Sequence, residues 1–164
     1  MQLPDAEQLL QTLAAHIRPL IDERTALVGI HSGGAWLAER LQAMLGGDIP
    51  LGVLDISFYR DDFSRIGLHP QIKPSSIPFD VEGCHIILID DVLYTGRTVR
   101  AAMNELFDYG RPARITLAAL VDRGGREMPI HAAIVGATIN LDPTQNLELA
   151  RDAAGKFHLK LTRA

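Results

Sequence analysis

The sequence lacks several features that mark common classes of protein. It has one cysteine among 164 residues, which excludes an intrachain disulfide framework and is ordinary in a reducing cytosol. No apolar run approaches the roughly 20 residues that a membrane-spanning helix needs. The first seven residues carry Asp5 and Glu7 but no basic residue, which argues against a signal or transit peptide. We therefore expect a cytoplasmic protein that does not bind membranes.

An excess of positive charge is also missing. The chain has 16 Lys and Arg against 20 Asp and Glu, a net charge of −4. This balance excludes a generally basic nucleic-acid binder, although a local basic patch stays open. Low-complexity tracts, internal repeats and Gly/Ser linkers are absent, and hydrophobic residues make up 47%. This composition suits one globular domain, which we expect to span residues 1–164.

Short apolar runs alternate with helical patterns along the chain. Strands are predicted at 26–30, 51–59, 85–90, 115–121, 132–137 and 157–161, and helices near 6–20, 36–45 and 98–109. This alternation predicts an α/β fold with a mainly parallel sheet flanked by helices. The stretch 60–78 holds three prolines and little periodicity, which is typical of a long functional loop. Ligands of parallel sheets bind beyond the carboxyl ends of the strands.

The most informative segment runs from Ile86 to Thr98. A buried strand ends in Asp90 and Asp91, and the turn Thr-Gly-Arg-Thr at 95–98 then opens a helix. Backbone N–H groups and the dipole at a helix N-terminus favour one phosphate there. The carboxylates can accept hydrogen bonds from vicinal hydroxyls and can hold Mg²⁺ directly or through water. Either half alone is an ordinary strand end or turn, but together they predict a ribose 5-phosphate site. The rival motifs GxxxxGK[ST] and GxGxxG are absent.

The segment IDDVLYTGRTVR at 89–100 resembles the phosphoribosyl diphosphate (PRPP) signature of type I phosphoribosyltransferases. A wider set, YRDD at 59–62, GRP at 110–112 and VDRG at 121–124, resembles the PyrR-type proteins. Those are pyrimidine operon attenuation regulators that also act as uracil phosphoribosyltransferases. The resemblance implies the type I phosphoribosyltransferase fold, with a flexible lid loop at about 60–78 and a small hood. It also implies a Mg²⁺-dependent transfer of phosphoribosyl from PRPP to uracil, which gives UMP and pyrophosphate.

The resemblance also implies roles for individual residues. Asp90 and Asp91 are the expected catalytic residues, because they would hold the ribose hydroxyls and Mg²⁺ and would stabilise a cationic sugar. Arg123 and Met128 would border the pocket for the base and pyrophosphate. The remaining expected PRPP-binding residues are Ser32, Gly33, Gly34, Arg60, Val92, Leu93, Tyr94, Thr95, Gly96, Arg97 and Thr98.

The turn after the first strand departs from the family pattern. PyrR-like chains often carry Thr-Arg-Gly there, whereas this chain has Ser-Gly-Gly at 32–34. A positive charge for pyrophosphate is therefore missing from this turn, and we expect Gly33→Arg to tighten PRPP binding. Arg60 is the candidate pyrophosphate ligand, although it can instead pair with Asp61 or Asp62. His31 either touches substrate or is a partly buried turn residue.

Three questions stay open at the level of sequence. The chain can be an enzyme or a leader-RNA-binding regulator with weak or no catalysis, and its base can be uracil or another nucleobase. Family members commonly associate, so we expect a homo-oligomer, a dimer or larger. Cys84 and Trp36 are expected to be packing residues rather than functional ones. The candidate RNA-contacting residues are Arg18, Arg24, Arg40, Arg100, Arg111 and Arg114.

Overall fold

A computed structural model of the chain describes residues 1–56 and 75–163. Its helices are α1 (Ala6–Ile17), the short 3-10 helix η1 (Arg18–Leu20), α2 (Gly33–Met44) and α4 (Arg97–Phe107). Its strands are β1 (Thr25–Ile30), β2 (Leu51–Leu54), β3 (His85–Leu93), β4 (Arg114–Asp122), β5 (Ile134–Thr138), β6 (Gln145–Arg151) and β7 (Phe157–Arg163). No helix among the described residues is both long enough and apolar enough to pass through a bilayer.

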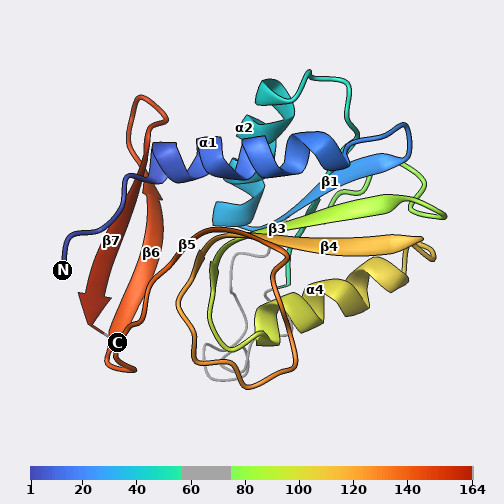
Figure 1. Ribbon diagram of the computed structural model, residues 1–164. Helices are drawn as coiled ribbons and strands as arrows, with labels where there is room; N and C mark the ends of the chain where they lie inside the picture. Colours follow the sequence, from blue (N-terminus) through green and yellow to red (C-terminus); the bar gives the residue numbers. More distant parts are fainter. Residues whose placement is uncertain (57–74, 164) are drawn as a thin grey trace.

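Five strands form one parallel sheet in the order β2-β1-β3-β4-β5 (Figure 1). From β1 the chain proceeds outward to β2, and it then returns to β3 on the other side of β1. The direction of strand succession therefore reverses between β1 and β3. A crevice at such a reversal, outside the carboxyl ends of the strands, is the usual ligand site of an open α/β sheet.

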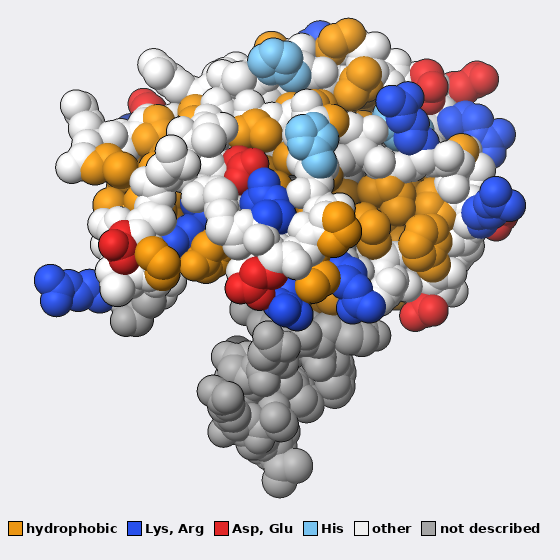
Figure 2. All heavy atoms as spheres, turned by 60° about the horizontal axis from the view of Figure 1, so that its bottom comes forward, with side chains coloured by type: hydrophobic (Ala, Val, Ile, Leu, Met, Phe, Trp, Pro, Cys, Tyr) orange, Lys and Arg blue, Asp and Glu red, His pale blue; other side chains and the backbone are white. Residues whose placement is uncertain are grey.

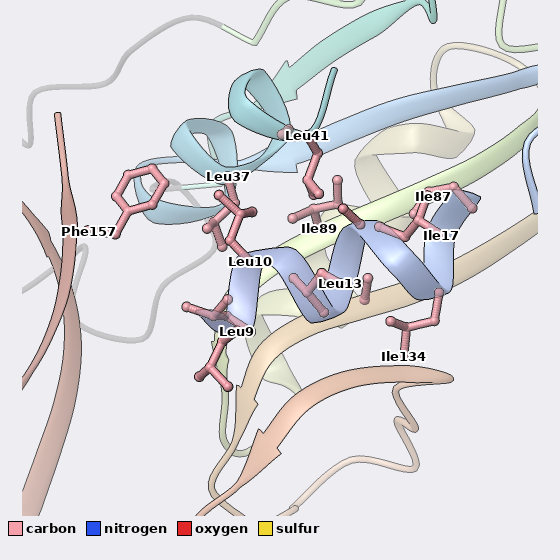
Figure 3. Close-up of a cluster of buried hydrophobic side chains, with 14 of the residues drawn as sticks. Leu9, Leu10, Leu13, Ile17, Leu37, Leu41, Ile87, Ile89, Ile134 and Phe157 are labelled. Carbon is pink, nitrogen blue, oxygen red and sulfur yellow. The ribbon is translucent and has the colours of Figure 1, made fainter. Parts of the chain in front are cut away.

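The two faces of the sheet have separate cores. On one face, α1 and α2 bury Leu10, Leu37 and Ile87 together with neighbouring apolar side chains (Figure 3). On the other face, the buried cluster joins α4 to Val28 and Leu88 and to residues of β4. Successive residues of a strand point to opposite faces, and the buried runs of β1 and β3 are apolar on both. This pattern explains why the two strands read as continuous apolar runs.

Strands β6 and β7 form a separate antiparallel hairpin, which we call the hood (residues 145–163). It lies at the end of the sheet near the start of α1 (Figure 1). Glu7 of α1 holds the hood against the helices. Its carboxylate accepts hydrogen bonds from Arg40 of α2 at 2.7 Å and from the Phe157 backbone N–H at 2.8 Å. The Arg40 guanidinium also lies 5.0 Å from the centre of the Phe157 ring. The hydrogen bond from Arg40 is the main cause of a lowered pKa of Glu7.

The α/β fold with a mainly parallel sheet is confirmed, and most strand predictions match within a few residues. Asp5 caps α1 by accepting a hydrogen bond from the Glu7 N–H. One strand of the hood, β6, was not predicted. The predicted strand 51–59 ends at Leu54, and its residues 57–59 lie outside the described residues. The end of the predicted lid is held to the sheet edge, because Ser76 and Val53 exchange two backbone hydrogen bonds of 2.8 Å.

Candidate functional site

A cavity of about 530 Å³ lies at the point where the strand succession reverses. Its walls come from the carboxyl ends of β1 and β3, the first turn of α2, the turn after β3, and strand β6 of the hood. The lining residues are Ile30, His31, Ser32, Gly33, Trp36, Asp90, Asp91, Val92, Tyr94, Thr98, Arg123, Asn146, Leu147, Glu148 and Leu149.

The two carboxylates predicted to be functional lie in this cavity. Asp90 is only 5% exposed, and one of its oxygens accepts a hydrogen bond from the Asp91 N–H at 2.9 Å. Asp91 accepts one from the Val92 N–H at 2.8 Å. These bonds fix both side chains at the end of β3. Two carboxylates with further lone pairs can accept sugar hydroxyls or join the ligand set of a hard cation.

Next to the carboxylates, the β3–α4 turn (residues 94–98) opens helix α4. Gly96 has a φ of 91°, a left-handed conformation that glycine adopts without steric cost. The Thr95 hydroxyl accepts a hydrogen bond from the Arg97 N–H at 3.2 Å. Gly96 itself makes no side-chain cap. A helix N-terminus presents N–H groups that lack intrahelical partners, together with a dipole that favours negative charge, so the start of α4 suits an anion.

A second segment, which we call the strap (residues 122–130), lies across the outer side of this turn. The backbone N–H groups of Glu127 and Met128 both donate to the Thr95 carbonyl, at 2.8 and 3.0 Å. A side chain at Gly96 would crowd Ile130, whose Cγ1 lies 2.9 Å from where a Cβ would stand. The Glu127 carboxylate pairs with Arg97 at 2.8 Å on the surface. The strap therefore fixes the position of the anion-binding turn.

Arg126 fastens the strap at both ends. Its guanidinium donates to the Tyr94 carbonyl at 2.6 Å, to the Ile130 carbonyl at 3.0 Å and to the Asp122 carboxylate at 2.7 Å. Burial of Asp122 opposes its ionisation. The hydrogen bonds from Arg126 and from the Gly124 N–H outweigh that burial and lower the pKa of Asp122.

The β1–α2 turn (residues 31–34) forms the opposite wall and has no charged side chain other than His31. Gly33 packs against Asp91 so closely that a Cβ would lie 2.7 Å from the Asp91 Cγ and would overlap its carboxylate. A Cβ on Gly34 would overlap the Ile89 carbonyl oxygen. Gly33 thus allows the turn to approach the Asp91 side chain, and Gly34 allows it to approach the backbone of β3. The expected benefit of Gly33→Arg is therefore at odds with the packing, because the new side chain would displace Asp91.

Arg123 occupies the boundary between the sheet and the hood. It is 4% exposed, and its guanidinium stacks 3.8 Å from the centre of the Tyr94 ring. Its terminal nitrogens donate to the Gln145 carbonyl at 2.8 Å and to the Asp142 carbonyl at 3.2 Å. Arg123 lines the cavity, as the sequence predicted. Its guanidinium is nevertheless bonded to the start of the hood and to the segment just before it.

The structure brings most of the predicted residues together and separates a few. Eight residues of the predicted set line the cavity: Ser32, Gly33, Asp90, Asp91, Val92, Tyr94, Thr98 and Arg123. Five further residues belong to the same turns and strand end but do not line the cavity: Gly34, Leu93, Thr95, Gly96 and Arg97. Met128 packs over Gly96 instead. Arg60 lies outside the described residues.

Sequence reasoning missed the hood wall. Trp36 packs against the core of α1 and α2, as expected. Trp36 lines the cavity, and the Arg151 guanidinium of β6 stacks 4.4 Å from the centre of its ring. The alternation of Asn146, Leu147, Glu148 and Leu149 was the available signal for a strand, since Leu147 and Leu149 are buried and the other two are exposed. Cys84 is half-buried and donates a hydrogen bond to the Asp80 carbonyl.

Comparison with known proteins agrees with this geometry. Residues 2–151 match the model of the phosphoribosyl transferase domain family. The chain is 51% identical over 157 residues to the bifunctional protein PyrR of Pseudomonas paraeruginosa, covering 93% of this chain and 92% of the relative. It is 61% identical over 128 residues to the bifunctional protein PyrR of Nitrosococcus oceani, covering 77% of this chain and 72% of the relative.

Solved structures show the same fold. A hypoxanthine phosphoribosyltransferase from Staphylococcus aureus matches with a TM-score of 0.68 and 21% identity, covering 88% of this chain and 79% of that one. A purine phosphoribosyltransferase from Pyrococcus horikoshii matches with a TM-score of 0.62 and 25% identity, covering 84% and 87%. The parallel sheet, the carboxylate pair at the end of β3 and these likenesses lead to one conclusion: the chain belongs to the phosphoribosyl transferase domain family, and within it to the PyrR proteins.

Proposed function

We propose that the chain transfers the phosphoribosyl group of PRPP to uracil, forming UMP and releasing pyrophosphate, and that it also regulates pyrimidine genes through a leader RNA. The observation that carries the enzymatic part is the meeting of Asp90 and Asp91 with two strand–turn–helix anion sites around one cavity. The relatives' name, bifunctional protein PyrR, supports both parts.

The two turns suit the two ends of PRPP. The β3–α4 turn offers the hydroxyls of Thr95 and Thr98 and the start of α4 to the 5-phosphate. The β1–α2 turn, 31–34, offers backbone N–H groups at the start of α2 to the pyrophosphate. Between them, Asp90 and Asp91 are placed to accept the ribose hydroxyls. PRPP would thus span the cavity from one helix N-terminus to the other.

The reaction breaks the bond from ribose C1 to the pyrophosphate oxygen and forms a bond from C1 to uracil N1, whose proton passes to the released pyrophosphate or to water. Positive charge develops on the sugar as pyrophosphate leaves, and the carboxylates of Asp90 and Asp91 stabilise that charge. The reaction requires that water be kept from the sugar, because water would otherwise capture and hydrolyse it. Little acid–base chemistry is demanded of side chains.

Mg²⁺ fits the donor set at the end of β3. This ion is commonly bound by one or two carboxylates together with substrate phosphates and water. Asp90 and Asp91 are such a pair, and no cluster of three or more His, Cys, Asp or Glu lies among the described residues to form a separate metal cage. When bound, Mg²⁺ would neutralise charge on the leaving pyrophosphate. We propose that these two residues hold it, directly or through water.

A base panel tests the enzymatic part. The protein is incubated with PRPP, Mg²⁺ and uracil, cytosine, hypoxanthine or adenine, and the nucleotide product is separated and measured. We expect UMP, with the rate falling by about 100-fold in Asp90→Asn because a charge-stabilising group next to the reacting carbon is lost. Consumption of another base in place of uracil would contradict the proposal. Full activity of Asp90→Asn would contradict the assigned site.

The regulatory part rests on the relatives rather than on a basic surface. On the face drawn in Figure 2, Lys and Arg side chains lie dispersed among apolar and acidic ones. Three of the six candidate arginines also donate to protein acceptors: Arg18 to Met44, Arg24 to Gly83 and Arg40 to Glu7. A gel shift with the leader RNA, with and without UMP, tests this part. We propose that the protein acts as a homo-oligomer in the cytoplasm, which sedimentation and cell fractionation can measure.

A further inference from the structure

The β1–α2 turn lacks a fixed positive charge for the pyrophosphate, which is the most highly charged part of PRPP. Its residues 31–34 include no Lys or Arg, and a side chain at Gly33 would overlap the Asp91 carboxylate. Arg123 is the one Lys or Arg among the described residues that line the cavity, and it is bonded to two backbone carbonyls at the hood. A cation for pyrophosphate therefore has to reach this turn from another element.

Strand β6 of the hood brings such a cation, Arg151, to the start of α2. Its guanidinium carbon lies 4.4 Å from the centre of the Trp36 ring, and Trp36 forms the cavity wall together with Ser32 and Gly33. Gly33 and Trp36 are three residues apart in α2, so they share one face of the helix. Because a helical side chain leans toward the helix N-terminus, the Trp36 ring lies over the first turn of α2, and Arg151 lies against that ring.

The N–H groups of the Arg151 side chain are not used within the protein. In the part of the chain that the structure describes, its guanidinium stacks on Trp36 but makes no hydrogen bond or ion pair. The neighbouring carboxylate, Asp152, accepts hydrogen bonds within its own hairpin turn instead. A guanidinium that is stacked by its face keeps the N–H groups in its plane free to point outward. This planar fork can bind two phosphate oxygens at once.

A second contact between a cation and a ring helps to hold Arg151 over Trp36. Arg151 and Phe157 are partners across the hairpin, and Arg40, one turn after Trp36 in α2, lies 5.0 Å from the centre of the Phe157 ring. A cation and a ring of the hairpin thus face a ring and a cation of the helix. Glu7 strengthens this junction, because it accepts hydrogen bonds from Arg40 and from the Phe157 N–H. Arg151 is therefore held near the helix start in advance, which reduces the entropy that binding costs.

The alternation of side chains along β6 agrees with this placement. Successive residues of a strand point to opposite faces, so Arg151 shares a face with Leu147 and Leu149, which are buried in the core with α1 and α2. Glu148 also lines the cavity, but the alternation turns its side chain to the other face of the hairpin, opposite Lys160 in the register. Within β6, Arg151 is therefore the one charged residue on the face that is turned toward the helices.

We propose that Arg151 binds the pyrophosphate group of PRPP at the start of α2, and thereby supplies from the hood the positive charge that residues 32–34 lack. This inference deepens the proposed function and rests on it. The pyrophosphate would lie between the N–H groups of the β1–α2 turn and the guanidinium, with the Trp36 ring as the surface that orients Arg151. Negative charge grows on the pyrophosphate as its bond to ribose C1 breaks, so this contact also favours its departure.

Calorimetric titrations of the full chain with pyrophosphate and Mg²⁺, and separately with ribose 5-phosphate, test the proposal. Arg151→Gln removes the charge, and Arg151→Lys keeps the charge but loses the planar fork. Arg163→Gln is the matched control, because Arg163 is an exposed arginine of the same hairpin that does not line the cavity. We expect pyrophosphate to bind about tenfold more weakly to Arg151→Gln and about threefold more weakly to Arg151→Lys. Ribose 5-phosphate should bind wild type and all three variants alike.

An unchanged affinity of Arg151→Gln for pyrophosphate overturns the proposal, as does a wild type that binds no pyrophosphate. A parallel loss of affinity for ribose 5-phosphate would mean that Arg151 only holds the hood in place, and an equal loss in Arg163→Gln would reduce the effect to net charge; either result contradicts the proposal. UMP synthesis by the wild type is measured separately with the base panel. A protein that binds pyrophosphate through Arg151 but makes no UMP would contradict the proposed function alone.

Discussion

The two turns that face each other across the cavity are built in opposite ways. The β3–α4 turn, 94–98, carries two hydroxyl side chains and a guanidinium, and the strap holds it through hydrogen bonds to the Thr95 carbonyl. The β1–α2 turn, 31–34, has side chains only at His31 and Ser32. Its shape comes from two glycines pressed onto β3 at Asp91 and Ile89. The first turn depends on the side chains of its residues, and the second depends on the absence of side chains at Gly33 and Gly34.

This difference predicts that the two turns respond differently to substitution. Changes in the β1–α2 turn should act through steric overlap with the neighbouring strand, so they should be severe and indifferent to charge. Changes in the β3–α4 turn and its strap should act through individual hydrogen bonds and charges, so they should be graded. The four substitutions below are ordered from the most to the least damaging.

Gly34→Ala should be the most damaging. Its Cβ would overlap the Ile89 carbonyl oxygen and lie 3.2 Å from the Ile89 carbonyl carbon, and backbone cannot rotate away. We expect a loss of about 3 kcal/mol in the free energy of unfolding, as for overpacking of a rigid interior. Urea denaturation measures it. A variant as stable as the wild type would show that the turn is not held against β3.

Gly33→Ala should damage activity more than stability. The atoms it meets belong to the Asp91 side chain, which can rotate. We expect unfolding to change by less than about 1 kcal/mol and kcat/KM for PRPP to fall about 100-fold, because the carboxylate leaves the ribose. Gly33→Arg should behave alike despite its charge. Tighter PRPP binding by Gly33→Arg would restore the expectation drawn from sequence and contradict the steric account.

Much of the fold was predictable because its signals are local. Neighbouring residues alone indicate the apolar runs of β1 and β3, the helix cap at Asp5 and the glycine turn at Gly96. The carboxylate pair and its turn were predictable for the same reason, since strand, acids and helix start are contiguous. The hood wall was not, because residues 146–149 meet the end of β3 only after folding, and because Arg123 is bonded there through the backbone carbonyls of Gln145 and Asp142.

Arg126→Met should weaken the strap. Three acceptors lose a charged donor, namely the Tyr94 and Ile130 carbonyls and the Asp122 carboxylate, so we expect a loss of about 2 kcal/mol. The pH dependence should change as well. Burial disfavours the charged form of Asp122, but hydrogen bonds from Arg126 and Gly124 prevail and lower its pKa in the folded protein.

The sign of the pH effect follows from that lowered pKa. Asp122 stabilises the fold above its unfolded pKa, near 3.8, and this contribution disappears as the pH falls from that value through the folded pKa. Wild type should therefore lose more stability than Arg126→Met between pH 5 and about pH 2. Thermal unfolding across this range measures the difference, with Arg100→Met as an exposed control. Equal pH slopes in wild type and variant would contradict the coupling.

Glu127→Gln should be the mildest change. Its pair with Arg97 is half-exposed, with side-chain accessibilities of 54% and 51%, so we expect at most about 0.5 kcal/mol. Arg97→Gln should be equally mild in stability but should raise KM for PRPP about fivefold, because a charge beside the phosphate is lost. Steady-state kinetics on both variants separates the two roles. Equal KM values would mean that Arg97 serves the strap alone.

The hydrogen bond from Phe157 to Glu7 joins residues 150 positions apart, and this has a consequence for biosynthesis. A ribosome adding about 5–20 residues per second needs roughly 8–30 s to pass from one to the other. Towards the end of that interval the emerging chain has both turns that border the cavity, but it still lacks the Phe157 N–H that binds Glu7 at the start of α1. The start of α1 therefore gains its hydrogen bond to the hood only when nearly the whole described chain has been made.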